Sequence, residues 1–383
     1  MNQFKNNFWP RPRDEATDFL LTAAAEVQEA AIVTAMTIWN DVLYFATSRA
    51  GVLPRLFRWD GETLQEIAPP PWTNGIVGMR ITVMAVYNNE LWIATSPNGV
   101  AAPNQVIEIW VWNGTAWFDA KTFAGWLAAP LNPCESIAAG GWGAGWMFVF
   151  DSMIFVGQDT AAVAVGVEIQ AWNGTTWLGA VEVVGVGGVG PAAGSSTTPT
   201  SRMHAPILNN EVYVGAYDAR AAAGGGTADA EVYRRDTAGT WTLTYTFPNT
   251  GVNTPTDPVE VLVRIDDDIW AAHGNDVNAL SGDPMQLARI RPLPNLVRRT
   301  GLGLRSGFTL AGAEGHQVAI VASPEKLWVF DPRRTNLELL TEYADDAPLT
   351  LLVFRKRIHV AQGSALVAGI NTPGFTARIG RLE

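Results

Sequence analysis

Three glutamates stand at matching places in three successive segments of the chain. Glu108, Glu168 and Glu231 each come four residues before the residue that leads into a short turn motif. Glycoside hydrolysis requires two carboxylates at a defined separation. The alternative is a structural role inherited with a repeat, in which each carboxylate bonds loop backbone or a neighbouring arginine. We expect the structural role.

A second set of residues suggests sialidase-like chemistry. Asp236 and the Gly-Thr-Trp sequence at 239–241 resemble part of the sialidase Asp-box. Arg80, Arg202 and Arg305 each precede an expected strand and could converge on a carboxylate ligand. However, the Asp-Gly spacing is one residue too long, only one segment has it, and no tyrosine nucleophile with a glutamate partner can be placed.

Metal and nucleophile motifs are missing from the sequence. The four histidines lie in different segments, and no two of them have the i, i+2 or i+4 spacing of metal ligands: His204, His273, His316 and His359. The run 266–268, Asp-Asp-Asp, is expected to be a solvated turn. No glycine-rich phosphate loop or Ser-His-Asp motif is present. We therefore expect no metal, no cofactor and no enzymatic activity.

Composition excludes several classes of partner. The chain has 383 residues, 48% of them hydrophobic, with 16 tryptophans and a net charge of −11. Such acidity disfavours binding to nucleic acid or to an anionic membrane. Cys134 is the single cysteine, so no internal disulfide framework exists. The first residues lack the pattern of a signal peptide, and no apolar run is long enough to span a membrane. We expect synthesis in a host cytoplasm without a signal peptide.

The elements that position these residues form a repeat. Trp-Asn-Gly-Thr-x-Trp occurs at 112–117 and again at 172–177. Asn-Gly between two apolar runs predicts a tight hairpin with a type I′ turn, which needs positive φ at both central residues. A pair of strands joined by a polar turn precedes each hairpin. Each unit therefore has four short strands, a to d.

Seven such units can be counted along the chain. Their b strands are centred near Tyr44, Trp92, Phe155, Tyr213, Trp270, Ile320 and His359. Steps of about 40–60 residues are typical of propeller blades. The sequence predicts an all-β fold, a β-propeller of four-stranded antiparallel blades, with seven blades as the count and six as the alternative. Most tryptophans and tyrosines are expected in the cores between blades.

Two regions are distinguished by this reading. Residues 31–383 form the propeller, and residues 1–30 are either an arm outside it or, through 18–26, the strand that closes the ring. The a–b and c–d turns are short and should share one face. The b–c and d–a loops on the other face are long and nearly uncharged, which suits packing against another protein: 96–105, 123–143, 158–166, 185–202 and 218–229.

The sequence resembles a known kind of repeat. "FRWDGETL", "WVWNGTAW" and "QAWNGTTW" are similar to the Trp-Asp/Asn-Gly-x-x-Trp propeller repeats of bacterial surface proteins and bacteriophage virion proteins. The fifth to seventh units lack this motif. The resemblance specifies the fold far better than it specifies the function. It is similar in type to phage tail propellers, such as nozzle, hub or fibre-attachment proteins.

The resemblance leads to one expectation for function. The protein would be a non-enzymatic structural part of a virion tail, present in several copies in a symmetric assembly. It would contact other virion or tail proteins through its long-loop face and through an N-terminal docking arm carrying Phe8, Trp9, Arg11 and Arg13.

Two alternatives stay open at this point. The first is a lectin-like propeller that binds a cell-surface glycan through Trp72, Trp126 and Trp142, which lie between repeat strands and should be exposed over a shallow pocket. The second is a glycosidase or sialidase-like enzyme using the three glutamates.

Overall fold

The computed structural model builds the protein from β-strands. The residues it describes are 21–28, 32–48, 52–72, 80–96, 108–119, 143–159, 167–178, 182–184, 205–218, 229–246, 259–273, 286–291, 296–299, 306–311, 317–323, 326–333, 336–342, 346–364 and 376–382. Every regular element in these ranges is a strand. None of them contains a helix that is long and apolar enough to cross a membrane.

The strands form seven four-stranded antiparallel sheets, which we number 1 to 7. Sheets 1 to 3 are made of β2 (Ile32–Trp39), β3 (Val42–Ser48), β4 (Arg55–Trp59) and β5 (Leu64–Ile67); β6 (Arg80–Tyr87), β7 (Glu90–Ser96), β8 (Ile109–Trp112) and β9 (Trp117–Asp119); and β10 (Gly143–Phe150), β11 (Met153–Asp159), β12 (Val167–Trp172) and β13 (Glu182–Val184). Sheets 4 and 5 are made of β14 (Ile207–Leu208), β15 (Glu211–Asp218), β16 (Asp229–Arg235) and β17 (Trp241–Thr246); and β18 (Val259–Ile265), β19 (Asp268–His273), β20 (Gln286–Arg291) and β21 (Leu296–Arg299). Sheets 6 and 7 are made of β22 (Ser306–Ala311), β23 (Gln317–Ser323), β24 (Lys326–Asp331) and β25 (Asn336–Glu342); and β26 (Asp346–Phe354), β27 (Arg357–Ser364), β28 (Thr376–Leu382) and β1 (Leu21–Gln28).

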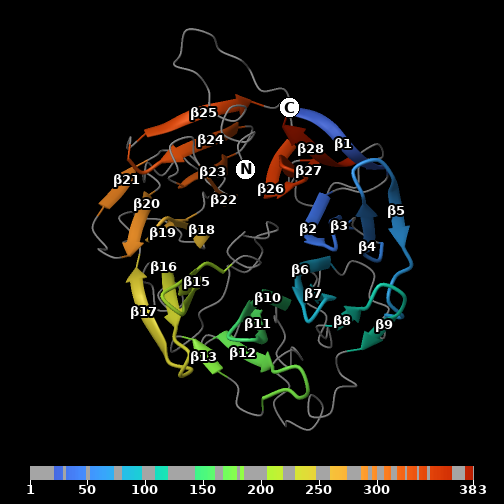
Figure 1. Cartoon of the computed structure of the whole chain (residues 1–383), viewed down its shortest axis with the longest axis horizontal. Coiled ribbons are helices and arrows are strands. Elements are labelled where there is room, and N and C mark those ends of the chain that lie inside the picture. Colours follow the sequence, from blue (N-terminus) through green and yellow to red (C-terminus); the bar gives the residue numbers. More distant parts are fainter. Residues whose placement is uncertain are drawn as a thin grey trace.

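The sheets are arranged radially around a ring (Figure 1), so the expected all-β propeller of four-stranded antiparallel blades is confirmed. In every sheet the strands follow the order a, b, c, d from the middle outwards. Sheet 7 takes its outer strand from the other end of the chain, because β1 pairs antiparallel with β28. Of the two roles left open for 18–26, the ring-closing strand is therefore the one observed. Residues 1–20 lie outside the described residues.

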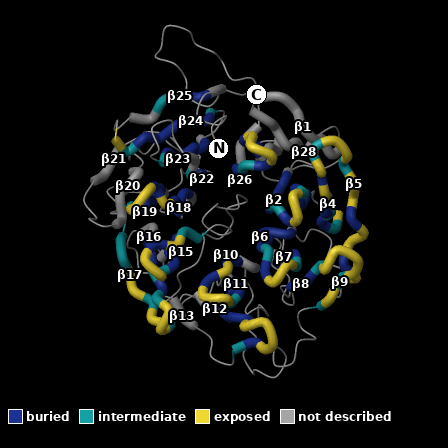
Figure 2. The backbone as a smooth tube through the Cα atoms, viewed as in Figure 1, coloured by how far each residue is buried: buried dark blue, intermediate teal, exposed yellow. Residues whose placement is uncertain are grey.

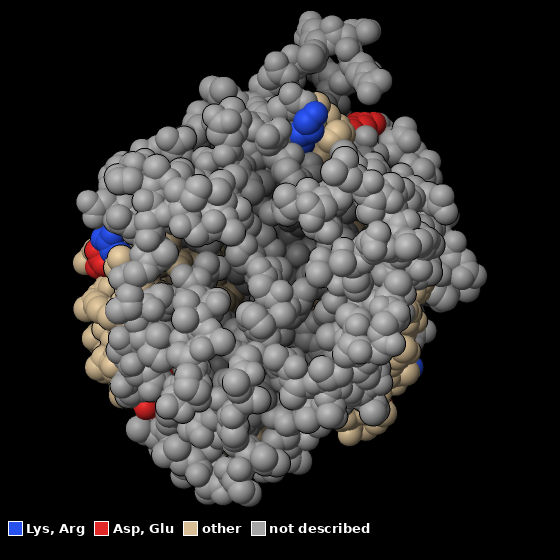
Figure 3. Space-filling model, turned by 180° about the vertical axis from the view of Figure 1, so that it is seen from behind, with Lys and Arg blue, Asp and Glu red and all other residues tan. Residues whose placement is uncertain are grey.

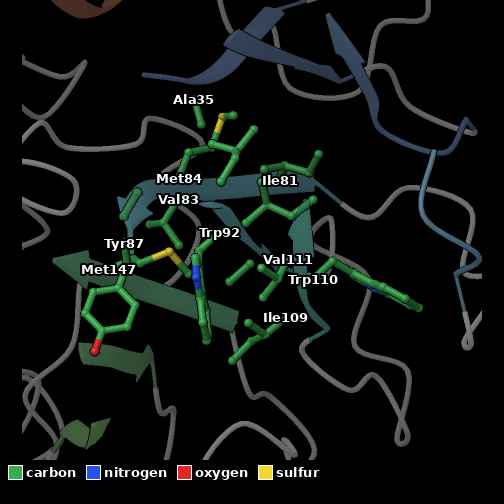
Figure 4. Close-up of a cluster of buried hydrophobic side chains, with 14 of the residues drawn as sticks. Ala35, Ile81, Val83, Met84, Tyr87, Trp92, Ile109, Trp110, Val111 and Met147 are labelled. Carbon is green, nitrogen blue, oxygen red and sulfur yellow. The ribbon is translucent and has the colours of Figure 1, made fainter. Parts of the chain in front are cut away.

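The hydrophobic core lies between neighbouring sheets rather than inside one unit. Six clusters of buried side chains together span all seven interfaces, and each contains residues of two or three adjacent sheets. Figure 4 shows part of the largest cluster, where Ala35 of sheet 1, Trp92 of sheet 2 and Met147 of sheet 3 come together. A four-stranded sheet has two apolar faces, and the ring covers both of them.

In four of the sheets, one side chain fills the gap to the preceding sheet. It is the residue directly before the Asp or Asn of the c–d turn, and it packs on the b-strand residue at the centre of the preceding sheet. Four such contacts are described: Trp59 with His359 (5.4 Å), Trp172 with Trp92 (6.3 Å), Arg235 with Phe155 (4.7 Å) and Phe330 with Trp270 (4.8 Å). The expectation that tryptophans fill the inter-blade cores is confirmed for these positions.

The a–b turns, rather than the Asn-Gly turns, have the type I′ geometry. Two successive residues with positive φ connect strands a and b in five sheets: Asn40-Asp41, Asn88-Asn89, Asp151-Ser152, Asn209-Asn210 and Arg355-Lys356. Asn and Asp tolerate this left-handed conformation better than other non-glycine residues. Figure 2 shows these exposed turns on the near side of the ring, with buried strands between them.

The prediction of a type I′ turn at Asn-Gly was wrong. Only the glycine has positive φ, for example 101° at Gly114, and the loop from Asn113 to Ala116 has four residues. The Asn113 side-chain oxygen accepts hydrogen bonds from the backbone amides of Thr115 and Ala116, both at 2.9 Å. The Asn side chain therefore shapes the turn by accepting these hydrogen bonds. The sequence alone does not distinguish this role from that of a residue in the left-handed backbone conformation.

The two kinds of turn share one face, as expected. A Cβ atom added at Gly61, in the c–d turn of sheet 1, would lie 2.8 Å from Arg355 Nη1 in the a–b turn of sheet 7. Neighbouring a–b turns are also linked, because Trp39 Nε1 donates to Asn89 Oδ1 (3.1 Å) and the Tyr87 hydroxyl donates to the Ser152 carbonyl (2.8 Å).

The inter-sheet contact of Trp270 gives a stability prediction. Trp270 is 1% exposed, so Trp270→Ala should lower the free energy of unfolding by about 3–5 kcal/mol through lost burial and a residual cavity. Trp270→Phe should cost much less, because the indole nitrogen finds no hydrogen-bond partner among the described residues. Urea unfolding followed by circular dichroism measures both, with Phe118→Ala at a 43% exposed position as control. Equal losses in all three variants would contradict the packing of Trp270 between neighbouring sheets.

Asp60 gives a pH prediction. The backbone amides of Thr63 and Glu62, together with the nearby Arg355 charge, hold the pKa of Asp60 below its usual value. A carboxyl with a depressed folded pKa stabilises the protein above its unfolded pKa, and this contribution is lost as pH falls through the folded pKa. The stability difference between wild type and Asp60→Asn should therefore stay constant above about pH 5 and shrink as the pH falls below about 4, the ordinary pKa of an aspartate.

The matched control for Asp60 lies in sheet 2. Asn113 makes the same two backbone contacts, so Asn113→Asp should introduce a pH dependence of the same sign. Thermal unfolding across the pH range tests both variants. A difference between wild type and Asp60→Asn that stays constant with pH would overturn this reading.

Candidate functional site

Glu108 is buried at the start of the c region of sheet 2. Its carboxylate accepts a hydrogen bond from Trp110 Nε1 at 2.7 Å. Its backbone amide donates to Thr95 Oγ1 at 2.9 Å, and its backbone carbonyl accepts from the Thr95 amide. Only 1% of the residue is exposed. Glu108 directly precedes β8, and residues i and i+2 of an extended segment share one face, so the acid meets the indole two residues later.

Glu231 repeats this arrangement in sheet 4. Its carboxylate accepts a hydrogen bond from the Tyr233 hydroxyl at 2.6 Å, and both residues are buried. Tyr233 contributes to the core between sheets 3 and 4. The carboxylate therefore supplies the polar partner that a buried phenol requires.

The equivalent residues of sheets 1 and 3 differ in type or in what is described of them. In sheet 1, Arg55 occupies the equivalent place, lies 4.9 Å from the ring of Phe57 and pairs with Glu66. In sheet 3, Glu168 belongs to β12, but its side chain lies outside what the structure describes. Gln170, two residues later, is buried. For Glu108 and Glu231 the described side-chain partners are aromatic residues two positions later, which agrees with the expected structural role.

The glutamates do not assemble as an acid–base pair within the described structure. Glu108 and Glu231 belong to sheets 2 and 4, with sheet 3 between them, and each contacts its own strand. Sequence reasoning aligned them correctly but missed Trp110 and Tyr233 as partners. The i, i+2 spacing of Glu and an aromatic residue was the available signal.

The Asp-box-like segment is also structural. Asp236 Oδ1 accepts the Thr240 amide at 2.9 Å and shapes the c–d turn. Arg235 is buried and lies over the rings of Phe155 and Phe150 in the preceding sheet. Arg235 stands where the repeat motif has a tryptophan, and its planar guanidinium packs on the aromatic rings of the preceding sheet as the indole would. Arg80 begins β6 without a described side chain, and Arg202 and Arg305 lie outside the described residues.

Trp72 does not form the exposed platform expected of a glycan site. It is half-buried, packs edge-on against Trp110 with ring centroids 6.3 Å apart, and adjoins the largest core cluster. Its indole nitrogen is buried and finds no hydrogen-bond partner among the described residues. The segment after β5 packs this indole against the inter-sheet core, so Trp72 is less open to solvent than the lectin-like alternative requires. Trp126 and Trp142 lie outside the described residues.

The remaining predicted contact regions fall mostly outside the described structure. The loop 185–202 lies wholly outside the described residues, and only terminal residues of the other four long loops are described. Phe8, Trp9, Arg11 and Arg13 also lie outside them. Within the described ranges, no group of three or more His, Cys, Asp or Glu side chains could hold a metal ion. Seen from behind, the few described charged side chains that are visible lie near the outline of the molecule (Figure 3).

Comparisons with known proteins identify the fold. No family model and no curated protein matches the chain. Virginiamycin B lyase from Staphylococcus aureus is similar with a TM-score of 0.55 and 10% identity, over 96% of this chain and 100% of the lyase. The extracellular domain of a hybrid two-component system from B. thetaiotaomicron gives a TM-score of 0.56 and 10% identity, over 95% of this chain and 39% of that one.

A third similar structure belongs to another class of protein. An α-L-arabinofuranosidase from Fusarium graminearum has a TM-score of 0.51 and 10% identity, over 94% of this chain and 98% of the enzyme. The chain therefore spans well under half of the two-component domain and nearly all of both enzymes. At this identity the likeness shows the propeller fold alone, and the three proteins differ in function.

Glu231 and Tyr233 give a prediction that separates a structural from a catalytic carboxylate. If the pair acts as one buried hydrogen bond, Glu231→Ala should cost about 1–3 kcal/mol, because it leaves the phenol unsatisfied. Tyr233→Phe should reduce that cost, and the double-mutant cycle should show a coupling of about 0.5–3 kcal/mol. Urea unfolding measures the cycle, with Glu62→Ala at an exposed carboxylate of sheet 1 as the control. Additive losses at Glu231 and Tyr233 would contradict the pairing.

Proposed function

We propose that this protein is a non-enzymatic structural subunit of a bacteriophage tail or virion, of the nozzle, hub or fibre-attachment type. The placement of Glu108 and Glu231 carries the proposal. Both recurrent carboxylates are buried and accept hydrogen bonds from aromatic side chains of the core, so they serve the repeat. A protein that uses its repeated acidic residues to stabilise its blades is suited to be a scaffold, which binds its partners through surface complementarity.

The proposal includes a ring of seven blades. Each of the seven four-stranded sheets is counted as one blade, and the pairing of β1 with β28 closes the ring. Closure between the two ends of the chain protects both terminal strands from separate exposure. Such a ring is a rigid disc on which long loops can carry binding surfaces.

The proposed partners are other virion or tail proteins, bound by several copies in a symmetric assembly. The long-loop face and the N-terminal arm with Phe8, Trp9, Arg11 and Arg13 are the proposed contacts. The charge of −11 disfavours a nucleic-acid partner. Cys134 is alone, which agrees with assembly in a cytoplasm without disulfide formation.

Particle purification tests the proposal. We expect peptide mass spectrometry of the large-particle fraction from the source culture to find this chain at an abundance stoichiometric with the other particle proteins. The soluble fraction of the same lysate is the control. A chain present only as free soluble protein would overturn the proposal, and binding to a glycan array by that free protein would favour the lectin-like alternative.

A further inference from the structure

A set of equivalent side chains lies on the innermost strands, next to the a–b turns. Figure 1 shows the a strands at the inner side of the sheets. Each member pairs with the residue directly before the central b-strand residue of its sheet, as Val149 pairs with Ile154 before Phe155. Every member is at least partly exposed. The set consists of Ile38, Val86, Val149, Ile207, Arg264, Thr309 and Val353.

Two pairs of neighbouring members are in direct contact. Arg264 Nη1 donates a hydrogen bond to the Ile207 carbonyl at 3.0 Å, and the Thr309 hydroxyl donates to the Arg264 carbonyl at 2.5 Å. A side chain at this position therefore reaches the equivalent residue of the preceding sheet. The apolar members belong to consecutive sheets, from sheet 7 through sheets 1 to 4, and we call them the apolar arc: Val353, Ile38, Val86, Val149 and Ile207.

The apolar arc is open to solvent at the inner rim of the short-turn face. Val149 is 37% exposed and Ile207 is 40% exposed. Single exposed apolar residues are common on protein surfaces, whereas a contiguous set of them marks an interaction surface. The arc therefore calls for a partner with apolar side chains of its own.

The turns that border the apolar arc carry charge of both signs. In sheet 7 the turn residues Arg355 and Lys356 are exposed. In sheets 1 and 3 the turns expose Asp41 and Asp151, and neither carboxylate forms an ion pair with a described residue. A segment that crosses the arc from sheet 7 towards sheet 3 therefore passes a basic turn first and acidic turns afterwards.

Residues 1–20 join the ring beside the basic turn. One row of paired residues crosses sheet 7 from the outer strand to the inner one: Thr22, Arg381, His359 and Leu352. Leu21 therefore lies at the end of sheet 7 that carries the β26–β27 turn. Three spacings between neighbouring strands, about 14 Å, separate Leu21 from the inner strand. Residues 14–20 span up to about 25 Å when extended, so the residues before them can reach the apolar arc.

The charge order of residues 1–20 matches the order of the turns. Residues 14–20 hold three acidic and no basic residues, and residues 1–13 hold three basic and no acidic ones. Along a path from Leu21, the acidic part meets the basic turn of sheet 7, and the basic part meets the acidic turns of sheets 1 and 3. Phe8 and Trp9 stand just before the arginines, and their two aromatic rings offer the apolar arc a large area to bury.

We infer that the N-terminal arm docks on the inner rim of its own ring, where Phe8 and Trp9 pack on the apolar arc. The two arginines of the arm lie beside the acidic turns of sheets 1 and 3, and the acidic residues that follow them lie beside the basic turn of sheet 7. Pro10 and Pro12 restrict the backbone of the arm, which lowers the entropy lost on docking.

The short connection favours docking within one chain over docking on a second copy. A short linker holds a tethered segment at an effective concentration of about 1 mM. A contact with a dissociation constant of about 0.1 mM is then formed about nine-tenths of the time within a chain, and rarely between separate chains at low micromolar concentration. The inference goes beyond the proposed function, because it concerns the isolated chain and holds whether or not that chain belongs to a particle.

Photo-crosslinking of the intact chain tests the inference. Phe8 is replaced by p-benzoylphenylalanine, which keeps an aromatic ring, and the chain is irradiated at low micromolar concentration. Peptide mass spectrometry should find cross-links within one chain to the segments that hold the apolar arc, at 36–39, 84–87, 147–150, 205–208 and 351–354. Cross-links only to other parts of the ring, cross-links only between two chains, or none at all would overturn the inference.

Paired variants of the ring show whether the apolar arc is the contact. Val149→Lys combined with Ile207→Lys removes apolar area and sets lysines near the arginines of the arm. The cross-link yield should fall about tenfold, because a contact weakened about 100-fold is formed about one-tenth of the time. The control is Phe118→Lys combined with Leu339→Lys, at outer-strand positions that are 43% and 46% exposed, and it should leave the yield unchanged. Equal yields in the two double variants would contradict docking on the arc.

A change in the arm itself gives a second test that alters none of the strands. Arg11→Glu combined with Arg13→Glu should also lower the cross-link yield, because glutamates then face the acidic turns of sheets 1 and 3. This variant replaces the arc variant if the latter fails to fold. A yield equal to that of the chain with both arginines would rule out the proposed charge pairing and with it the inference.

Discussion

The structure depends on the contact that each sheet makes with its neighbour. A four-stranded sheet buries one face at most by itself, and here every cluster of buried side chains crosses at least one boundary between sheets. At four of these boundaries, the residue before the c–d turn packs on the central b-strand residue of the preceding sheet. Trp59, Trp172 and Phe330 fill the position with aromatic rings, and Arg235 fills it with a guanidinium plane.

Polar residues inside the blades serve this packing. Glu108 accepts from Trp110, and Glu231 accepts from Tyr233, so large amphipathic rings enter the core with their polar atoms satisfied. At the short-turn face, the Asn89 side chain and the Ser152 carbonyl accept hydrogen bonds from side chains of neighbouring sheets. The same turns that reverse the chain therefore also link adjacent sheets.

Rigid blades leave the surface free to vary, and this separates fold from function. A lyase, an arabinofuranosidase and the extracellular domain of a two-component system share the propeller fold with this chain at 10% sequence identity. The shared fold therefore does not determine what this protein does.

The sequence by itself determined the repeat, the strands and the central b-strand residues. Alternating apolar residues and turn residues act locally, so they can be read without tertiary contacts. It also identified Glu108 and Glu231 as equivalent positions. Only the tertiary structure decided what these residues contact: the i+2 aromatic rings for the glutamates, and the core for Trp72. It also decided that β1 closes the last sheet. Pairing between residues 21–28 and 376–382 leaves no periodic trace in the sequence, because the two strands come from opposite ends of the chain.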